Sequence, residues 1–221
     1  STRIAFDLVS APRTSGLVVD PTIEFSTFWG VGTSGLLYTD MAADSAGNAI
    51  IAATVSTPTF PTTPGAYDTT YNDPGGVNFA DVFVMKMNST GTNLIYSTFI
   101  GGNQKEEPWV ALASDSVGNA YLCGGTWSTN FPQTPGAPYL NTGHGAYLCK
   151  LDPLGASLLF STYIANDTTR PWSMAADENG NAFATGIVFA PGLLVTPGAF
   201  QPFATLGMFI SKMDTVNTTI G

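Results

Sequence analysis

The chain has 221 residues, of which 44% are hydrophobic and only 10% are charged, with 24 glycines and 15 prolines. This mixture favours many short strands joined by turns within one sizeable core, and it argues against a helical bundle. The net charge of −9, with only seven Lys and Arg, excludes nucleic acid as an expected partner.

The polar residues of the chain are mainly Thr, Ser and Asn, with few lysines. An acidic surface of this kind fits an extracellular protein, so we expect a secreted or cell-surface location. No run of about 18 apolar residues occurs, and we therefore expect no membrane insertion.

Three short phrases each occur three times along the chain. They are aromatic-Ser-Thr-aromatic (25–28, 96–99, 160–163), Asp-x-x-Gly-Asn (44–48, 115–119, 177–181) and Thr-Pro-Gly-Ala (63–66, 134–137, 196–199). The last two phrases recur at intervals of 71 and then 62 residues. The first repeat is longer because of a turn-rich insertion between Pro64 and Lys86. Such periods indicate a stacked or radial repeat architecture.

The second repeat shows the elements of one unit most clearly. The expected strands cover 109–115, 119–124, 146–151 and 158–164, and a long loop spans 125–145. The tight turn at Asp115–Asn119 joins the first two strands, because its Asp can accept backbone N–H bonds and its Gly can take a positive φ. Four short antiparallel strands per repeat predict an all-β protein, a β-propeller built of four-stranded blades.

The same phrases, in the same order, resemble the SBBP-repeat β-propeller family of bacteria and archaea. The matching segments are Tyr96-Ser-Thr-Phe99, Asp115–Asn119, Phe60-Pro-Thr-Thr-Pro-Gly65 and Phe83-Val-Met-Lys-Met87. The resemblance covers roughly residues 17–214, and the third repeat departs from it at Leu193, where Leu-Leu-Val-Thr-Pro replaces Phe-Pro-x-Thr-Pro. It implies a large secreted or cell-surface protein, and it implies no shared catalytic activity.

The repeats predict about three blades that are permuted by one strand. The last repeat offers three strands, whereas an orphan outer strand ends at Thr27 near the start. We expect a lead-in at 1–23 that serves blade closure or strand exchange, and repeats at 24–94, 95–158 and 159–221. Propellers typically have four to eight blades. The expected partners are therefore copies of the chain, in a six-bladed ring or a fibre, or further blades of a longer chain.

The two cysteines occupy neighbouring strands of one blade. Cys123 and Cys149 fall at equivalent places in the second and third strands, which predicts a cross-strand disulfide if the protein is exported. The alternative is two buried free thiols that behave as small hydrophobic side chains.

The loops at one end of the blades carry the candidate binding residues. They are Glu106, Glu107, Trp127, His144, Asn72 and Asp73. The adjacent carboxylates can serve acid–base work on a glycan or coordinate calcium, and the alternative is that they are simply solvated. His144 is the only histidine, so a zinc site is not expected. Trp127 is the expected exposed aromatic for sugar stacking, whereas Trp109 and Trp172 are expected to pack between blades.

Asn88, Asn166 and Asn217 each begin an Asn-x-Thr pattern, and we expect them at turns or loops where a glycan fits. The sequence contains no nucleophilic triad and no phosphate-binding glycine loop, and we expect no enzymatic activity and no required cofactor. The expected function is a non-catalytic extracellular structural or adhesion module that assembles through its terminal strands. The alternative is a carbohydrate-binding or carbohydrate-active propeller that uses the long-loop face.

Overall fold

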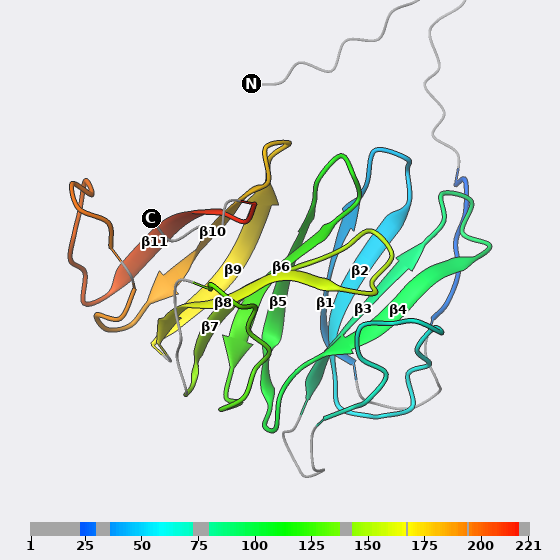
Figure 1. The fold of residues 1–221 in the computed structure, drawn as a ribbon, viewed down its shortest axis with the longest axis horizontal. Helices are drawn as coiled ribbons and strands as arrows, with labels where there is room; N and C mark the ends of the chain where they lie inside the picture. The colour runs from blue at the N-terminus through cyan, green and yellow to red at the C-terminus, as the bar shows by residue number, and fades with distance from the viewer. Residues whose placement is uncertain are drawn as a thin grey trace, which may run out of the picture.

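The structure, a computed structural model, describes residues 23–29, 36–72, 80–137, 143–166, 168–193 and 195–216 (Figure 1). Within these ranges the chain forms strands and no helix. The strands are β1 (Leu36–Ala43), β2 (Ala49–Val55), β3 (Asp81–Met87), β4 (Leu94–Ile100), β5 (Glu106–Ser114), β6 (Ala120–Thr126), β7 (Gly145–Leu151), β8 (Leu158–Asn166), β9 (Thr169–Ala176), β10 (Asn181–Val188) and β11 (Gly207–Asp214). None of the described segments is a helix that could cross a membrane.

The strands form three antiparallel sheets, which we call blades 1, 2 and 3. Blade 1 has the order β1-β2-β3-β4, blade 2 has β5-β6-β7-β8, and blade 3 has β9-β10-β11. Figure 1 shows the blades packed one after another, with β5 lying between β1 and β9. The all-β, propeller-like fold is therefore confirmed. The expected repeat boundaries at 94/95 and 158/159 fall where β4 and β8 begin, so the repeat is offset from the blade by one strand.

The Asp-x-x-Gly-Asn turns close the first hairpin of every blade. In blade 2, Asp115 Oδ1 accepts hydrogen bonds from the backbone N–H groups of Gly118 and Asn119, both at 3.0 Å. Gly118 has φ +92°, a left-handed conformation that side chains with a Cβ rarely adopt. The structural role that the sequence predicts for this turn is confirmed.

Two apolar cores lie between the blades. Leu122 and Cys149 belong to the core between blades 1 and 2, and Cys123 and Leu148 belong to the core between blades 2 and 3. The register of β6 and β7 pairs Leu122 with Cys149 and Cys123 with Leu148. Because directly opposed residues share a face and successive residues alternate, the two thiols lie on opposite faces of the sheet.

The predicted disulfide is therefore wrong, and both cysteines are free and buried. The error is one residue of register, because the sequence comparison treated Cys123 and Cys149 as an opposed pair. A shift of one residue moves a side chain to the other face of a sheet.

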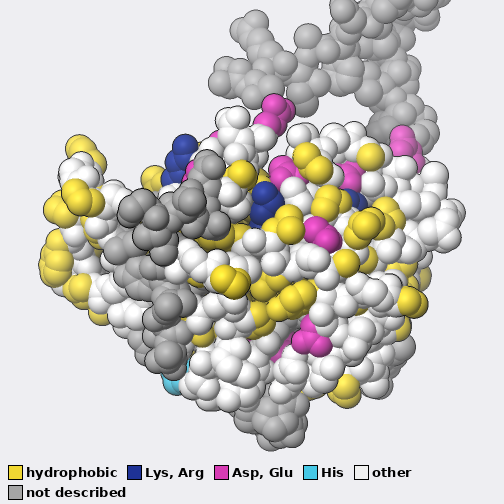
Figure 2. All heavy atoms as spheres, in the orientation of Figure 1, with side chains coloured by type: hydrophobic (Ala, Val, Ile, Leu, Met, Phe, Trp, Pro, Cys, Tyr) yellow, Lys and Arg dark blue, Asp and Glu magenta, His cyan; other side chains and the backbone are white. Residues whose placement is uncertain are grey.

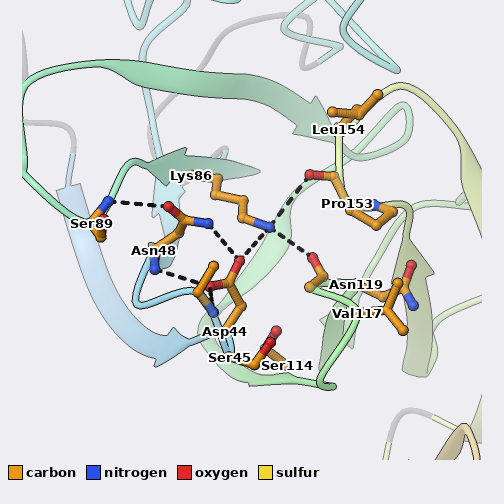
Figure 3. A network of polar contacts seen from close by, with 12 residues as sticks. Asp44, Ser45, Asn48, Lys86, Ser89, Ser114, Val117, Asn119, Pro153 and Leu154 are labelled. Atoms are coloured by element: carbon orange, nitrogen blue, oxygen red, sulfur yellow. Dashed lines mark hydrogen bonds and ion pairs between the residues drawn. The ribbon is translucent and has the colours of Figure 1, made fainter.

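A lysine from each of the first two blades reaches into the next blade. Lys86 Nζ lies 2.8 Å from Asp44 Oδ2, and it donates to the carbonyl oxygens of Gly118 at 3.1 Å and Pro153 at 3.5 Å (Figure 3). Asp44 belongs to blade 1, whereas Gly118 and Pro153 lie in two turns of blade 2. The lysine therefore fastens one blade to the next.

Lys150 repeats this arrangement between blades 2 and 3. Its Nζ lies 3.9 Å from Asp115 Oδ2 and donates to Thr215 Oγ1 at 3.4 Å. The sequence analysis assigned no role to these lysines, and the recurrence of Lys at 86, 150 and 212 was the available signal.

Candidate functional site

The long-loop face gathers three of the predicted binding residues. The Trp127 indole Nε1 donates to Glu107 Oε1, and the His144 ring lies 4.6 Å from the Trp127 ring, measured between centroids. Two cations complete the group, because Lys105 Nζ lies 4.9 Å from the Trp127 ring centroid and Arg170 Nη2 lies 3.6 Å from Glu107 Oε1. We call Glu107, Trp127, His144, Lys105 and Arg170 the long-loop cluster.

Glu106 does not join this cluster, because successive side chains of β5 point to opposite faces. Its Oε1 accepts hydrogen bonds from Thr126 Oγ1 at 3.0 Å and Ser128 Oγ at 2.8 Å. A Cβ atom at Gly101 would collide with Asp81 Oδ1 and Glu106 Oε2, so both carboxyl groups converge over this glycine. The two predicted carboxylates therefore do not act as a pair.

The second carboxyl beside Glu106 comes from Asp81 of blade 1, which the sequence analysis did not single out. Asp81 is fully buried and Glu106 is 1% exposed. Burial and the neighbouring Asp81 carboxyl raise the pKa of Glu106 well above its ordinary value. The alternative that the adjacent acids are merely solvated is wrong for both, because Glu107 is only 8% exposed.

The predicted Asn72 joins Asp81 and not the long-loop cluster. Its backbone N–H donates to Asp81 Oδ2 at 2.6 Å, and its side-chain amide donates to Asp68 Oδ2 at 2.6 Å. Asp73 lies outside the described residues. Among the residues that the structure describes, no three His, Cys, Asp or Glu side chains group in a way that could hold a metal ion.

The tryptophans differ from the expectation. Trp109 is 41% exposed and Trp172 is 54% exposed, whereas Trp127 is only partly exposed. Trp109 and Trp172 line an open hollow of about 490 Å³ along the first strands of the blades, together with Tyr38, whose ring centroid lies 5.9 Å from that of Trp109. Trp109 therefore contacts the neighbouring blade through Tyr38, but neither Trp109 nor Trp172 is buried between blades, because the first strand of each blade faces this open hollow.

Two of the three expected glycan acceptors can be placed. Asn88 lies in the turn between β3 and β4, and its amide donates to Thr90 Oγ1 at 2.9 Å. Asn166 is the last residue of β8, and its Oδ1 accepts from Thr168 Oγ1 at 2.6 Å. Asn217 lies outside the described residues. Modification of all three stays a prediction.

The outer face of blade 3 leaves large apolar side chains exposed. Ile210 of β11 is 82% exposed, and Met208 is 85% exposed. The equivalent positions to Ile210 in the other blades are Val84 and Leu148, which are 0% and 1% exposed because the next blade covers them. Blade 3 therefore presents the same apolar face without a blade against it.

Further apolar side chains extend this face beyond β11. Phe200, Phe203 and Leu206 of the loop between β10 and β11 are 105%, 64% and 70% exposed. Figure 2 shows hydrophobic side chains along the left edge of the molecule, where Figure 1 places this loop. A monomer rarely leaves such a patch open, and contiguous patches of this kind mark interaction surfaces.

Comparisons with known proteins give a fold likeness and no family. No protein-family model matches the chain, and the search of curated proteins finds no match. Among solved structures, the chain is similar to the Hadza microbial sialidase Hz136, with a TM-score of 0.47 and 9% sequence identity. The match covers 83% of this chain, which spans only 36% of the sialidase.

Proposed function

We propose that the protein is a non-catalytic structural or adhesion module that joins further copies of itself through the outer face of blade 3. The observation that carries this proposal is the exposure of Ile210, because Val84 and Leu148 at the same place are covered by the next blade. In blades 1 and 2 the following blade covers this apolar face. The same face of blade 3 is therefore suited to contact another blade. Burying such apolar surface is the main driving force for association.

The carboxyl groups support a non-catalytic role. Glu106 is buried at the blade junction, and Glu107 is 8% exposed and engaged by Trp127 and Arg170. A catalytic acid must reach the substrate within hydrogen-bond distance. The resemblance to SBBP repeats supports a secreted or cell-surface location, because that family is associated with such proteins, and it supports a non-catalytic role, because it implies no shared catalytic activity.

The native mass of the full chain tests this proposal. We expect a species of two or more copies at micromolar concentration, measured by light scattering or native mass spectrometry. Ile210→Asn should shift it towards the single-copy mass. Leu154→Asn is the matched control, because Leu154 is 67% exposed but lies in a turn away from this face. A single-copy mass for the unaltered chain at every concentration would contradict the proposal.

A second candidate function is saccharide binding at the long-loop cluster. The convergence of Glu107, Trp127 and His144 favours it, because an aromatic face beside hydrogen-bonding groups is how proteins hold sugar rings. Lys105 and Arg170 would favour an acidic saccharide. A glycan array tests this, with Trp127→Phe expected to abolish any signal and Trp172→Phe as the control. An array without signal for the unaltered protein would remove this candidate.

A further inference from the structure

We propose that residues 23–29 of a second copy form the fourth strand of blade 3, beside β11, and that the loop at Thr196 binds this strand. The inference rests on the proposed function and names the segment that makes the contact. It explains why an aromatic-Ser-Thr-aromatic phrase stands at 25–28, ahead of the first complete blade.

Blade 1 shows how such a strand is held. Ser97 of β4 donates its backbone N–H to Thr63 Oγ1 at 3.0 Å and its hydroxyl to the Pro61 carbonyl oxygen at 2.8 Å. Thr63 returns a backbone hydrogen bond to the Ser97 carbonyl oxygen at 3.1 Å. The Ser of the fourth strand and the Thr-Pro-Gly loop are therefore a matched pair.

Blade 2 repeats these contacts with different residues. Ser161 donates its backbone N–H to Thr134 Oγ1 at 3.0 Å and its hydroxyl to the Pro132 carbonyl oxygen. Thr134 returns its backbone N–H to the Ser161 carbonyl oxygen at 3.0 Å. The Ser of the aromatic-Ser-Thr-aromatic phrase therefore pairs with the Thr-Pro-Gly loop in both complete blades.

Blade 3 carries the accepting loop in the same shape. The Ala199 N–H donates to the Thr196 carbonyl oxygen at 3.2 Å, and Gly198 has φ +81°. The corresponding turn of blade 1 has a bond of 3.1 Å from Ala66 and φ +79° at Gly65. Yet, among the described residues, β11 pairs only with β10, and no strand lies against Thr196.

The place of the missing strand is a cavity. A volume of about 500 Å³ lies between β11 and the loop, with Leu193, Thr196, Phe203 and Phe209 in its lining. Its lining is mostly apolar. The Thr196 side chain in this lining corresponds to Thr63 and Thr134, which accept a hydrogen bond from the fourth strand in blades 1 and 2. An edge strand beside an apolar groove accepts an extended segment by strand addition.

The donor segment is exposed and lies beside blade 1. All of residues 23–29 are exposed, with Ile23 at 84% and Phe28 at 102%. A Cβ atom at Gly91 would collide with the Phe25 ring, just as a Cβ atom at Gly155 would collide with the Tyr96 ring. Tyr96, in the fourth strand of blade 1, lies against the last turn of blade 2. Phe25 lies against the last turn of blade 1 in the same way, so segment 23–29 has the position relative to blade 1 that β4 has relative to blade 2.

This equivalence settles the geometry of the docked pair. When blade 1 of a second copy covers the outer face of blade 3, its segment 23–29 falls where β4 and β8 lie in their own blades. By the registers of Leu148 with Thr162 and of Cys149 with Ser161, Thr27 then lies opposite Ile210 and Ser26 opposite Ser211. One docking event therefore covers the apolar face and fills the groove.

Cysteine cross-linking of full-length chains tests the register. Thr27→Cys is mixed with Ile210→Cys and oxidised, and we expect a disulfide between two copies, identified by non-reducing electrophoresis and peptide mapping. Both positions are exposed in the single copy, so neither change endangers folding. The matched control is Ser26→Cys with Ile210→Cys, because Ser26 faces the other side of the donated strand.

The outcomes separate the inference from the proposed function. A disulfide at Thr27 at least tenfold more abundant than at Ser26 supports strand donation. An assembled protein in which both pairs cross-link equally, or neither does, overturns strand donation and leaves the assembly standing. A protein that is a single copy at all concentrations overturns both.

Discussion

Lys86 Nζ and Asp44 Oδ2 lie 2.8 Å apart, and both side chains are nearly buried, with exposures of 4% and 5%. The same ammonium group donates to the Gly118 carbonyl oxygen of blade 2. The Lys86 ammonium group therefore joins the Asp44 turn of blade 1 to the backbone of blade 2.

Replacing Lys86 with Met should destabilise the fold by about 3–5 kcal/mol, because it leaves a buried carboxylate without its cation. Urea denaturation followed by tryptophan fluorescence measures this. Lys212→Met is the matched control, because Lys212 occupies the same place in blade 3 but is exposed. Equal losses for the two variants would show that the junction does not depend on the lysine.

Stability should fall in acid between about pH 4 and pH 2. Burial alone would raise the pKa of Asp44, but hydrogen bonds from Lys86 and Asn48 outweigh it and lower the pKa from 3.8 to about 2. A carboxyl with a lowered folded-state pKa contributes stability above its unfolded pKa, and this is lost as the pH falls through the folded value. Denaturation midpoints measured from pH 2 to pH 6 should fall towards low pH. The fall should be smaller in Lys86→Met, because that variant lacks the cation that lowers the pKa of Asp44.

Glu106→Gln should stabilise the protein at neutral and higher pH. The pKa of Glu106 is raised by burial and by Asp81, so the folded protein holds this proton above the pH at which the unfolded chain releases it. Stability from such a group is complete below the unfolded pKa and declines as the pH rises towards the folded pKa. The amide keeps the acceptor for Thr126 and Ser128 and removes the decline. A variant with the same pH dependence as the unaltered protein would contradict the carboxyl pairing.

The two thiols should resist modification in the folded protein. Burial raises the pKa of Cys123 to about 12 and raises the pKa of Cys149 as well, so neither forms the reactive thiolate near neutral pH. Iodoacetamide should label neither cysteine without denaturant and both in 6 M guanidinium, as mass spectrometry can show. Two unlabelled cysteines in denaturant without reductant would instead indicate a disulfide.

The sequence predicted the blades well because their signals are local. Turn residues such as Asp115 and Gly118 act within a few positions, and alternating apolar runs mark the strands. The disulfide prediction was wrong because it depended on the exact register between β6 and β7. No repeated phrase in the sequence specifies that register.

The candidate site was predicted only in part, for a related reason. Trp127 and His144 fall in one long loop, so their proximity to Glu107 follows from blade topology. The Asp81 carboxyl beside Glu106 comes from another blade, and only the packing of β3 near β5 brings it there. Such cross-blade contacts have no signature within one repeat.

The forward reach of Lys86 and Lys150 gives the chain a polarity. Each of these two lysines contacts the blade that follows its own, so contacts between copies that repeat this order would be head-to-tail, with one donor end and one acceptor end. Head-to-tail contacts close into a ring when the rotation permits and otherwise run on as a filament. A copy with a spoiled acceptor face, such as Ile210→Asn, would still donate its strand. Added in small amounts, it would act as a cap that stops growth at one end only.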